Sequence, residues 1–179
     1  MLDIIPENPT RHADRIEALY DVTFGPGHFA KTAERLREFN RSLPDLNRIA
    51  IDPTGRVVGA VRMWPILIER GGLAVFVGPV AVHPDARGKK LGLDLCRLAL
   101  EAAREADWPA AIIIGSRSYF SELGFVPVDE GQLGFPGPQD VARVMRMDLA
   151  GDSSLYSGTI IPHRIYSSGG QFAKAQFRV

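Results

Sequence analysis

Residues 85–92, DARGKKLG, gather basic side chains and glycines between an apolar run and a stretch with helical periodicity. The first N–H groups of a helix lack intrahelical partners and carry partial positive charge, so they bind phosphate oxygens readily. Cations alone are slightly unfavourable at a helix start, which favours a bound anion over the alternative of a merely solvated basic surface. The basic residues are Arg87, Lys89 and Lys90, and the glycines that permit close backbone approach are Gly88 and Gly92.

Two common phosphate-binding loops are excluded by spacing. A mononucleotide loop needs G-x-x-x-x-G-K-[ST], but His83 stands five residues before Gly88, and Lys89 is followed by another lysine. A dinucleotide loop needs G-x-G-x-x-G between the first strand and first helix of its fold, whereas this turn lies in mid-chain with different glycine spacing. The predicted anion therefore belongs to another class of ligand.

The elements that position the turn follow from the pattern around it. Residues 73–82 are almost continuously apolar, which is typical of a strand buried on both faces. Gly78 and Pro79 within that strand predict a bulge, because proline has no N–H to donate. Residues 90–106 predict a helix and residues 110–114 a strand, so the three form a right-handed parallel crossover. The helix is predicted to share one apolar face among Leu91, Leu95, Leu98 and Ala102.

The remaining segments predict an α/β (α+β) fold with a central mixed sheet and flanking helices. A first helix begins at a Thr10 cap and ends at Gly25-Pro26-Gly27. A second helix is predicted over residues 30–40, and residues 48–51 and 56–64 form an antiparallel hairpin. Further predictions are helical turns at 118–123, strands at 125–128, 141–149 and 159–161, and a loop at 131–138.

Composition narrows the functional classes. The 179 residues carry 21 Lys and Arg against 21 Asp and Glu, so no net charge attracts nucleic acid or an anionic membrane. One cysteine and four histidines without ligand spacing give no metal site. The N-terminal residues lack a signal-peptide pattern, and a cytoplasmic protein is expected. We expect one domain over residues 1–150, with residues 151–179 as an extension packed on it.

The turn resembles the acetyl-CoA signature of the GNAT superfamily of N-acetyltransferases, V-x-P-x-x-[RQ]-G-x-G-x-[GA]. Residues 82–92 read VHPDARGKKLG, and the order of predicted elements matches this family over about residues 1–150. "GPVAVHPDARGKKLG" followed by "IIIGSRSYFSELGFVPV" is most similar to a bacterial branch of predicted acetyltransferases without an agreed substrate. The resemblance implies the acyl-CoA N-acyltransferase fold and acetyl-CoA as co-substrate.

The resemblance also implies where the coenzyme binds. In the family, the diphosphate lies on the turn, and the pantetheine arm lies along the fourth strand like an added strand. An N–H near Val80 would polarise the thioester carbonyl. The second glycine of the family motif is replaced by Lys90; we expect a negative φ there and retained binding, because the backbone N–H is kept. The implied coenzyme-binding residues are Val80, Ala81, Val82, Arg87, Gly88, Lys89, Lys90, Leu91, Gly92 and Phe120.

Catalytic side chains are less well defined. Family members often protonate the leaving thiolate with a tyrosine four residues before the glycine of LGF, but Phe120 occupies that position here and Tyr119 precedes it. A one-residue shift on a helix rotates a side chain by about 100°, so Tyr119 is expected to point away from the family position and Phe120 only to pack against the coenzyme, which leaves the general acid open. Tyr119 and Ser116 are the candidate catalytic residues. Cys96 is predicted to lie in the core, which favours direct transfer over an acyl-enzyme.

The acceptor and its base stay open. Glu69, His83 and Asp129 are conceivable bases, but each is better explained as a solvated or structural residue. An acceptor pocket is predicted over the first two helices and the 131–138 loop, lined by Phe29, Trp64, Phe135 and His163.

The resulting interpretation is acetyl transfer to a primary amine of a small molecule or to a peptide N-terminus, without metal, nucleic acid or membrane. A non-catalytic acyl-CoA sensor is the alternative, because Phe120 replaces the usual tyrosine. A third interpretation is a protein that keeps the fold but pairs with partners through a strand of its C-terminal extension. A homodimer is left open.

Overall fold

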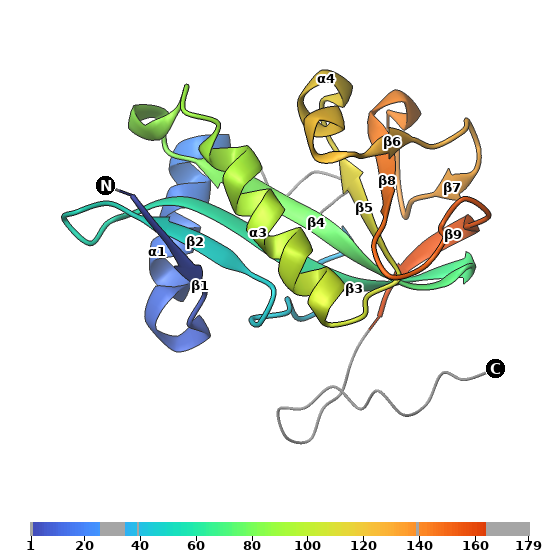
Figure 1. Cartoon of the computed structure of the whole chain (residues 1–179), viewed down its shortest axis with the longest axis horizontal. Helices are drawn as coiled ribbons and strands as arrows, with labels where there is room; N and C mark the ends of the chain where they lie inside the picture. Colours follow the sequence, from blue (N-terminus) through green and yellow to red (C-terminus); the bar gives the residue numbers. More distant parts are fainter. Residues whose placement is uncertain (1, 26–34, 39, 139, 164–179) are drawn as a thin grey trace.

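The computed structural model describes residues 2–25, 35–38, 40–138 and 140–163, which form a nine-stranded mixed sheet with helices on both faces (Figure 1). The strands are β1 (Asp3–Pro6), β2 (Arg48–Ile51), β3 (Val57–Arg70), β4 (Gly72–Val82), β5 (Ala110–Ile114), β6 (Val126–Pro127), β7 (Leu133–Gly134), β8 (Val144–Asp148) and β9 (Ser157–Pro162). The helices are α1 (Pro9–Phe24), α3 (Leu91–Glu105) and α4 (Arg117–Phe120), with 3-10 turns η2 (Pro84–Ala86), η3 (Ser121–Leu123) and η4 (Val141–Arg143).

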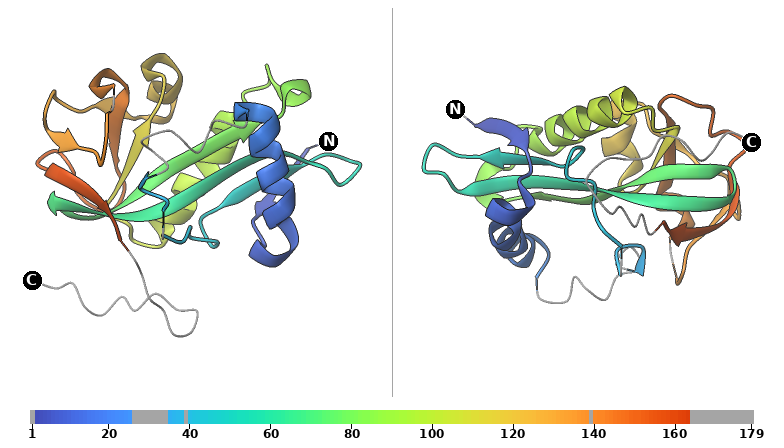
Figure 2. Two further views of the ribbon diagram at one scale, coloured as in Figure 1. Left: turned by 180° about the vertical axis from the view of Figure 1, so that it is seen from behind. Right: turned by 90° about the horizontal axis from the view of Figure 1, so that it is seen from below.

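The sheet runs in the order β1-β2-β3-β4-β5-β8-β6, and β9 pairs with both β3 and β7. Strands β4 and β5 are parallel and joined through α3, whereas β1–β2, β2–β3 and β3–β4 are antiparallel. Helices α1 and α3 cover opposite faces of the sheet (Figure 2). The predicted mixed α/β sheet, its hairpin and its parallel crossover are therefore confirmed.

The long β3–β4 hairpin contains the predicted bulge. Val61 pairs with Val80 and Met63 with Val77, so two residues of β4 face one residue of β3. Those two residues are Gly78 and Pro79, joined by a cis peptide bond. The interruption falls where proline removes a ladder hydrogen bond, as the sequence predicts.

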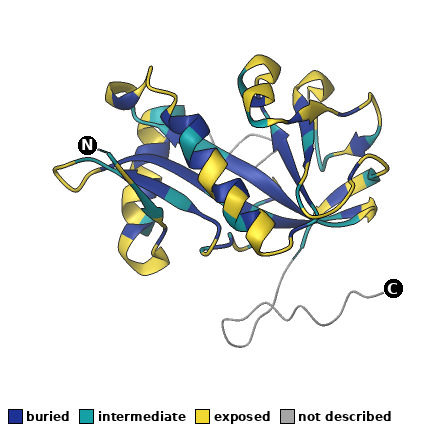
Figure 3. Ribbon diagram, in the orientation of Figure 1, coloured by how far each residue is buried: buried dark blue, intermediate teal, exposed yellow. Residues whose placement is uncertain are grey.

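Helix α3 packs its apolar face on the sheet, and buried residues follow that face in Figure 3. Leu91 and Leu95 are buried as expected, and Cys96 is a fully buried core residue. The prediction was wrong for Leu98, which is 37% exposed. The buried stripe is instead centred on Cys96, Ala99 and Ala103; at about 100° per residue, Leu95 lies at its edge and Leu98 falls outside it.

Helix α1 begins two residues earlier than predicted. Asn8, not Thr10, is the N-cap, and its side-chain oxygen accepts hydrogen bonds from the amides of Thr10 and Arg11 at 3.1 and 3.0 Å. Pro9 at the first helical position explains this start, since its fixed φ suits that position and its missing N–H needs no partner there. Gly25, with φ of 75°, ends the helix. The predicted second helix, residues 30–40, lies mostly outside the described residues.

The C-terminal half departs from the predictions mainly in strand lengths. Strand β8 starts at Val144, because Asp140 caps a 3-10 turn over residues 141–143. Strand β6 is shorter than predicted, and the 131–138 loop contains β7, which pairs with β9. The predicted last strand is confirmed as β9, which pairs antiparallel with the far end of β3. The division at residue 150 stays a prediction. No described helix has the length and hydropathy needed to span a membrane.

Candidate active site

The basic turn leads directly into α3, as predicted. Gly88 has φ of 84°, and Lys90 is the helix N-cap with φ of 55° and ψ of 16°. The expected negative φ at Lys90 is therefore wrong: the residue lies just outside the helix, and the chain reverses through a left-handed conformation there. For a non-glycine residue this conformation costs about 1–2 kcal/mol, which explains why a glycine suits the position.

Backbone amides of the turn point to an anion site. The carbonyl of Lys90 accepts from Leu93 N and Asp94 N at 2.8 and 3.1 Å, so the helix begins there. Within the described part of the chain, the amides of Gly88, Lys89 and Leu91 have no hydrogen-bond acceptor. Unsatisfied N–H groups at a helix start are the groups that phosphate oxygens accept from.

The cationic side chains of the turn are not equivalent. Lys90 Nζ forms an ion pair with Glu122 Oε2 at 2.5 Å, which links the start of α3 to the turn after α4. Arg87 Nε lies 3.4 Å from the carbonyl oxygen of Val82. Lys89 is exposed and has no ion-pair partner among the described residues. Lys89 and Arg87 are therefore better placed than Lys90 to pair with an external anion.

Beyond the bulge, β4 leaves its neighbour β5. The two strands pair at Val75, Phe76 and Val77, and the described residues show no further pairing between them. His83 N donates to Val58 O on β3. Since successive residues of a strand direct N–H groups to opposite edges, the amides of Val80 and Val82 face the side that β5 has left. Figure 1 shows the two strands diverging toward the start of α3.

Tyr119 lies beside this opening. Its hydroxyl oxygen is 2.7 Å from the position that a Cβ on Gly92 would occupy, next to side-chain atoms of Val80 and Val82. Burial raises the pKa of the Tyr119 hydroxyl. The turn, the bulged strand and this tyrosine thus meet, and a side chain larger than glycine at position 92 would displace the hydroxyl.

Phe120 contacts Tyr119 edge to face, with ring centroids 5.0 Å apart, and lies in the core. It is 8% exposed, its ring edge packs against Phe125, and a Cβ on Gly115 would lie 2.2 Å from its ring. The ring of Phe120 thus belongs to the core, and its contact with the coenzyme stays a prediction. Ser116 is exposed at the N-cap position of α4, but its hydroxyl lies 3.0 Å from that of Ser118 and caps no amide.

The candidate bases do not gather at the opening. Glu69 lies at the tip of the β3–β4 hairpin, seven residues from the bulge and thus about 20 Å away along the strand. The Thr159 amide donates to Glu69 and holds its carboxyl pKa below the usual range. Asp129 is exposed, and His83 Nδ1 accepts from Asp85 N at 3.3 Å. The structure thus removes Glu69 from the site and gives the other two no catalytic contact.

The predicted acceptor pocket is described only in part. Trp64 and Phe135 both pack on the core cluster that covers the sheet face opposite α3. Burial lowers the pKa of His163. Phe29 lies outside the described residues. Trp64 and Phe135 therefore lie on one face of the sheet, and contact of the predicted pocket residues with an acceptor stays a prediction.

Sequence reasoning missed a buried polar cluster behind the bulge. Arg62 lies in β3 directly opposite the bulged residues of β4, and its side chain is 12% exposed. It pairs with Glu7, whose side chain is 2% exposed. A charged residue within the apolar run VVGAVRMWPILI was the available signal. Its partner, 55 positions away, has no signal in the sequence.

Known proteins resemble the chain over most of its length. The model of the acetyltransferase (GNAT) family matches residues 13–125. Escherichia coli K12 YhbS, described as an uncharacterized N-acetyltransferase, is 28% identical over 138 residues, covering 75% of this chain and 81% of YhbS. The structure of E. coli YhbS in complex with CoA has a TM-score of 0.75 and 26% identity, covering 90% of this chain and 89% of that one.

A second solved structure extends the likeness of fold. The Brucella melitensis GNAT family acetyltransferase in complex with acetyl-CoA has a TM-score of 0.65 and 22% identity, covering 91% of this chain and 96% of that chain. The family model matches more than half of the chain and includes the bulged strand, the basic turn and α3. The chain therefore belongs to the GNAT family of N-acetyltransferases.

Proposed function

We propose that this N-acetyltransferase binds acetyl-CoA in the opening between β4 and β5 and transfers the acetyl group directly to an amine. The acceptor is a primary amine of a small molecule or a peptide N-terminus. The observation that carries the proposal is the end of β4–β5 pairing at Val77, beside the unpaired amides that begin α3. The CoA and acetyl-CoA complexes of the two related proteins support it.

The residues of the turn fit a diphosphate. The amides of Gly88, Lys89 and Leu91 supply donors, and the side chains of Lys89 and Arg87 supply charge. The free edge of β4 at Val80 and Val82 supplies donors and acceptors for an amide-containing arm. Because the chain has no net charge, this attraction is local.

Direct transfer agrees with the state of the one cysteine. The neutral amine nitrogen attacks the thioester carbonyl carbon, the C–N bond forms and the C–S bond breaks; the nitrogen releases one proton and the leaving thiolate takes one. Burial raises the pKa of the Cys96 thiol to about 12, so the thiolate needed for an acyl-enzyme is scarce at neutral pH. Tyr119 reaches the opening and retains its proton, which favours an enzyme over a sensor.

Turnover tests the proposal. Thiol release from acetyl-CoA is measured against a panel of small primary amines and peptides with free N-termini, with calorimetry of coenzyme binding alongside. We expect binding, and acetylation of at least one amine with stoichiometric thiol release. Binding with no turnover across the panel would favour the sensor, and absence of binding would contradict both.

Coenzyme affinity should depend on the side chains of Arg87 and Lys89 and not on the side chain of Lys90. We expect the variant R87A/K89A to raise the Kd of acetyl-CoA about tenfold, because two exposed charge-assisted contacts are lost. The variant K90G should keep the Kd within about twofold, since the Lys90 side chain is paired with Glu122 and glycine accepts the positive φ. R97A/R104A removes the same charge from exposed positions further along α3 and serves as the control. If calorimetry gives an unchanged Kd for R87A/K89A, the diphosphate does not bind at this turn.

Tyr119 is predicted to protonate the leaving thiolate. Removing its hydroxyl in Y119F should lower kcat about tenfold to a hundredfold, at the low end of general-acid effects. Tyr156→Phe, at another partly buried tyrosine, is the control. Because burial raises the pKa of Tyr119 above its usual value of 10, the acid form persists at neutral pH, and the part of kcat that depends on the Tyr119 proton should be lost only as pH rises beyond that value. A wild-type kcat for Y119F in stopped-flow assays would exclude this role.

A further inference from the structure

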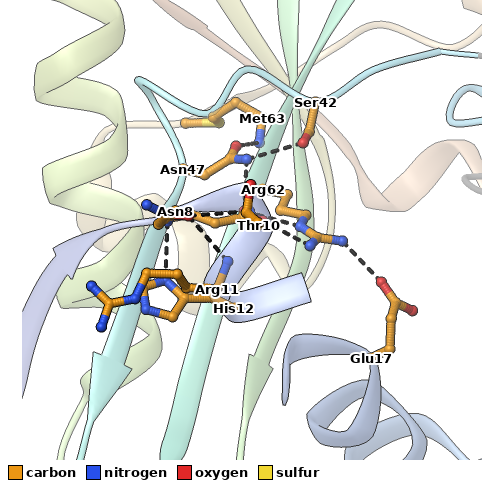
Figure 4. Close-up of polar contacts among 10 residues, drawn as sticks. Asn8, Thr10, Arg11, His12, Glu17, Ser42, Asn47, Arg62 and Met63 are labelled. Atoms are coloured by element: carbon orange, nitrogen blue, oxygen red, sulfur yellow. Dashed lines mark hydrogen bonds and ion pairs between the residues drawn. The ribbon is translucent and has the colours of Figure 1, made fainter. Parts of the chain in front are cut away.

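A buried polar network lies behind the bulge, on the sheet face opposite α3 (Figure 4). Arg62 donates through Nε and Nη2 to the two carboxylate oxygens of Glu7, at 3.0 and 2.8 Å. Asn47 Nδ2 donates to the same carboxylate at 2.8 Å, and Asn47 is fully buried. We call Glu7, Asn47 and Arg62 the bulge network. Its bidentate geometry fixes the direction as well as the distance of the contact.

The bulge network holds one short piece of β3. Asn47 Oδ1 accepts from Met63 N at 2.8 Å, and Leu43 N donates to Met63 O at 2.8 Å. Strand β2 ends its pairing with β3 at Val61, so these contacts replace a neighbouring strand at that edge. Arg62 is therefore anchored through its side chain, and Met63 through both of its backbone groups.

This piece of β3 is the segment that faces the bulge. Val61 pairs with Val80 and Met63 with Val77, so Arg62 stands opposite Gly78 and Pro79. An ordinary ladder would fix β4 here, but the bulge interrupts it. The position of Val80 relative to the opening thus depends on how firmly β3 is held at residues 61–63.

Stability alone gives a weak reason for the network. A buried ion pair stabilises a fold no better than apolar side chains of similar volume, because both charges must be desolvated. The network has a clearer explanation if the Glu7–Arg62 pair fixes the position of an adjacent backbone group. The surrounding groups are Glu17 Oε1, which accepts from Arg62 Nη1 at 2.9 Å, and the Tyr20 ring, 5.8 Å from Arg62 Cζ.

We propose that Glu7, Asn47 and Arg62 are positioning residues, which hold β3 so that the Val80 amide is aimed at the thioester carbonyl. The inference rests on the proposed function, because it assigns a role within that site. The network itself touches neither substrate. Its loss should reduce polarisation of the carbonyl, and therefore kcat, while the diphosphate contacts at the start of α3 keep coenzyme affinity unchanged.

The test uses the double variant E7L/R62M, which removes both charges and leaves neither buried alone. We expect kcat to fall about tenfold, with the Kd of acetyl-CoA within twofold of the wild-type value. The control is I160A, which removes packing from the fully buried Ile160 beside the far end of β3. It should lower Tm but keep kcat at temperatures well below unfolding. If the double variant shows a cooperative Tm and a wild-type kcat, the network has only a structural role and the proposal is wrong.

A second measurement does not need an acceptor. The infrared carbonyl stretch of bound acetyl-CoA should shift to lower frequency in the wild-type protein, and E7L/R62M should lose most of that shift. If no amine is acetylated but the carbonyl shift is present and lost in the variant, the proposed function fails and the positioning role stands. An equal shift in both proteins would overturn the positioning role whatever the turnover.

A milder variant covers the case in which E7L/R62M does not fold. Arg62→Lys keeps the positive charge and the apolar stem but cannot form the bidentate contact. We expect it to lose part of kcat and part of the carbonyl shift, again with unchanged coenzyme affinity. Wild-type values of both quantities in a folded R62K protein would contradict the proposal.

Discussion

Strand β4 loses β5 as its neighbour after Val77, and the rest of the site depends on that divergence. Gly78 and Pro79 interrupt the opposite ladder at the same point, so the strand turns a free edge toward the start of α3. The following crossover through η2 then places unpaired helix amides beside that edge. One local break in pairing thus produces both a backbone surface and an anion site, which together suit a long ligand with a diphosphate at one end.

Backbone groups supply most of the proposed coenzyme site. Lys90 replaces a glycine of the family motif, yet it presents the same amide and adopts the left-handed conformation that glycine would. Phe120 replaces the usual tyrosine of the family and packs on Gly115, while the neighbouring Tyr119 places its hydroxyl at Gly92. Side chains matter where they set geometry: Tyr119 at the opening, and the bulge network behind it.

Much of the fold was predictable because its signals are local. The apolar run of β4, its glycine and proline, and the periodicity of α3 each lie within one segment. Errors arose where neighbours compete or tertiary geometry decides. Asn8 and Thr10 are both good caps, and Pro9 selects the first. The φ of Lys90 is set by the chain reversal before α3, and the Glu7–Arg62 contact joins residues 55 positions apart, beyond any periodic pattern.

The crystal structure of the protein in complex with acetyl-CoA tests the central claim most directly. The account predicts diphosphate oxygens within hydrogen-bond distance of the amides of Gly88, Lys89 and Leu91. It also predicts the pantetheine arm along β4, with the thioester carbonyl at the Val80 amide. A coenzyme bound with its diphosphate away from the start of α3, or with its arm outside the opening between β4 and β5, would contradict the account.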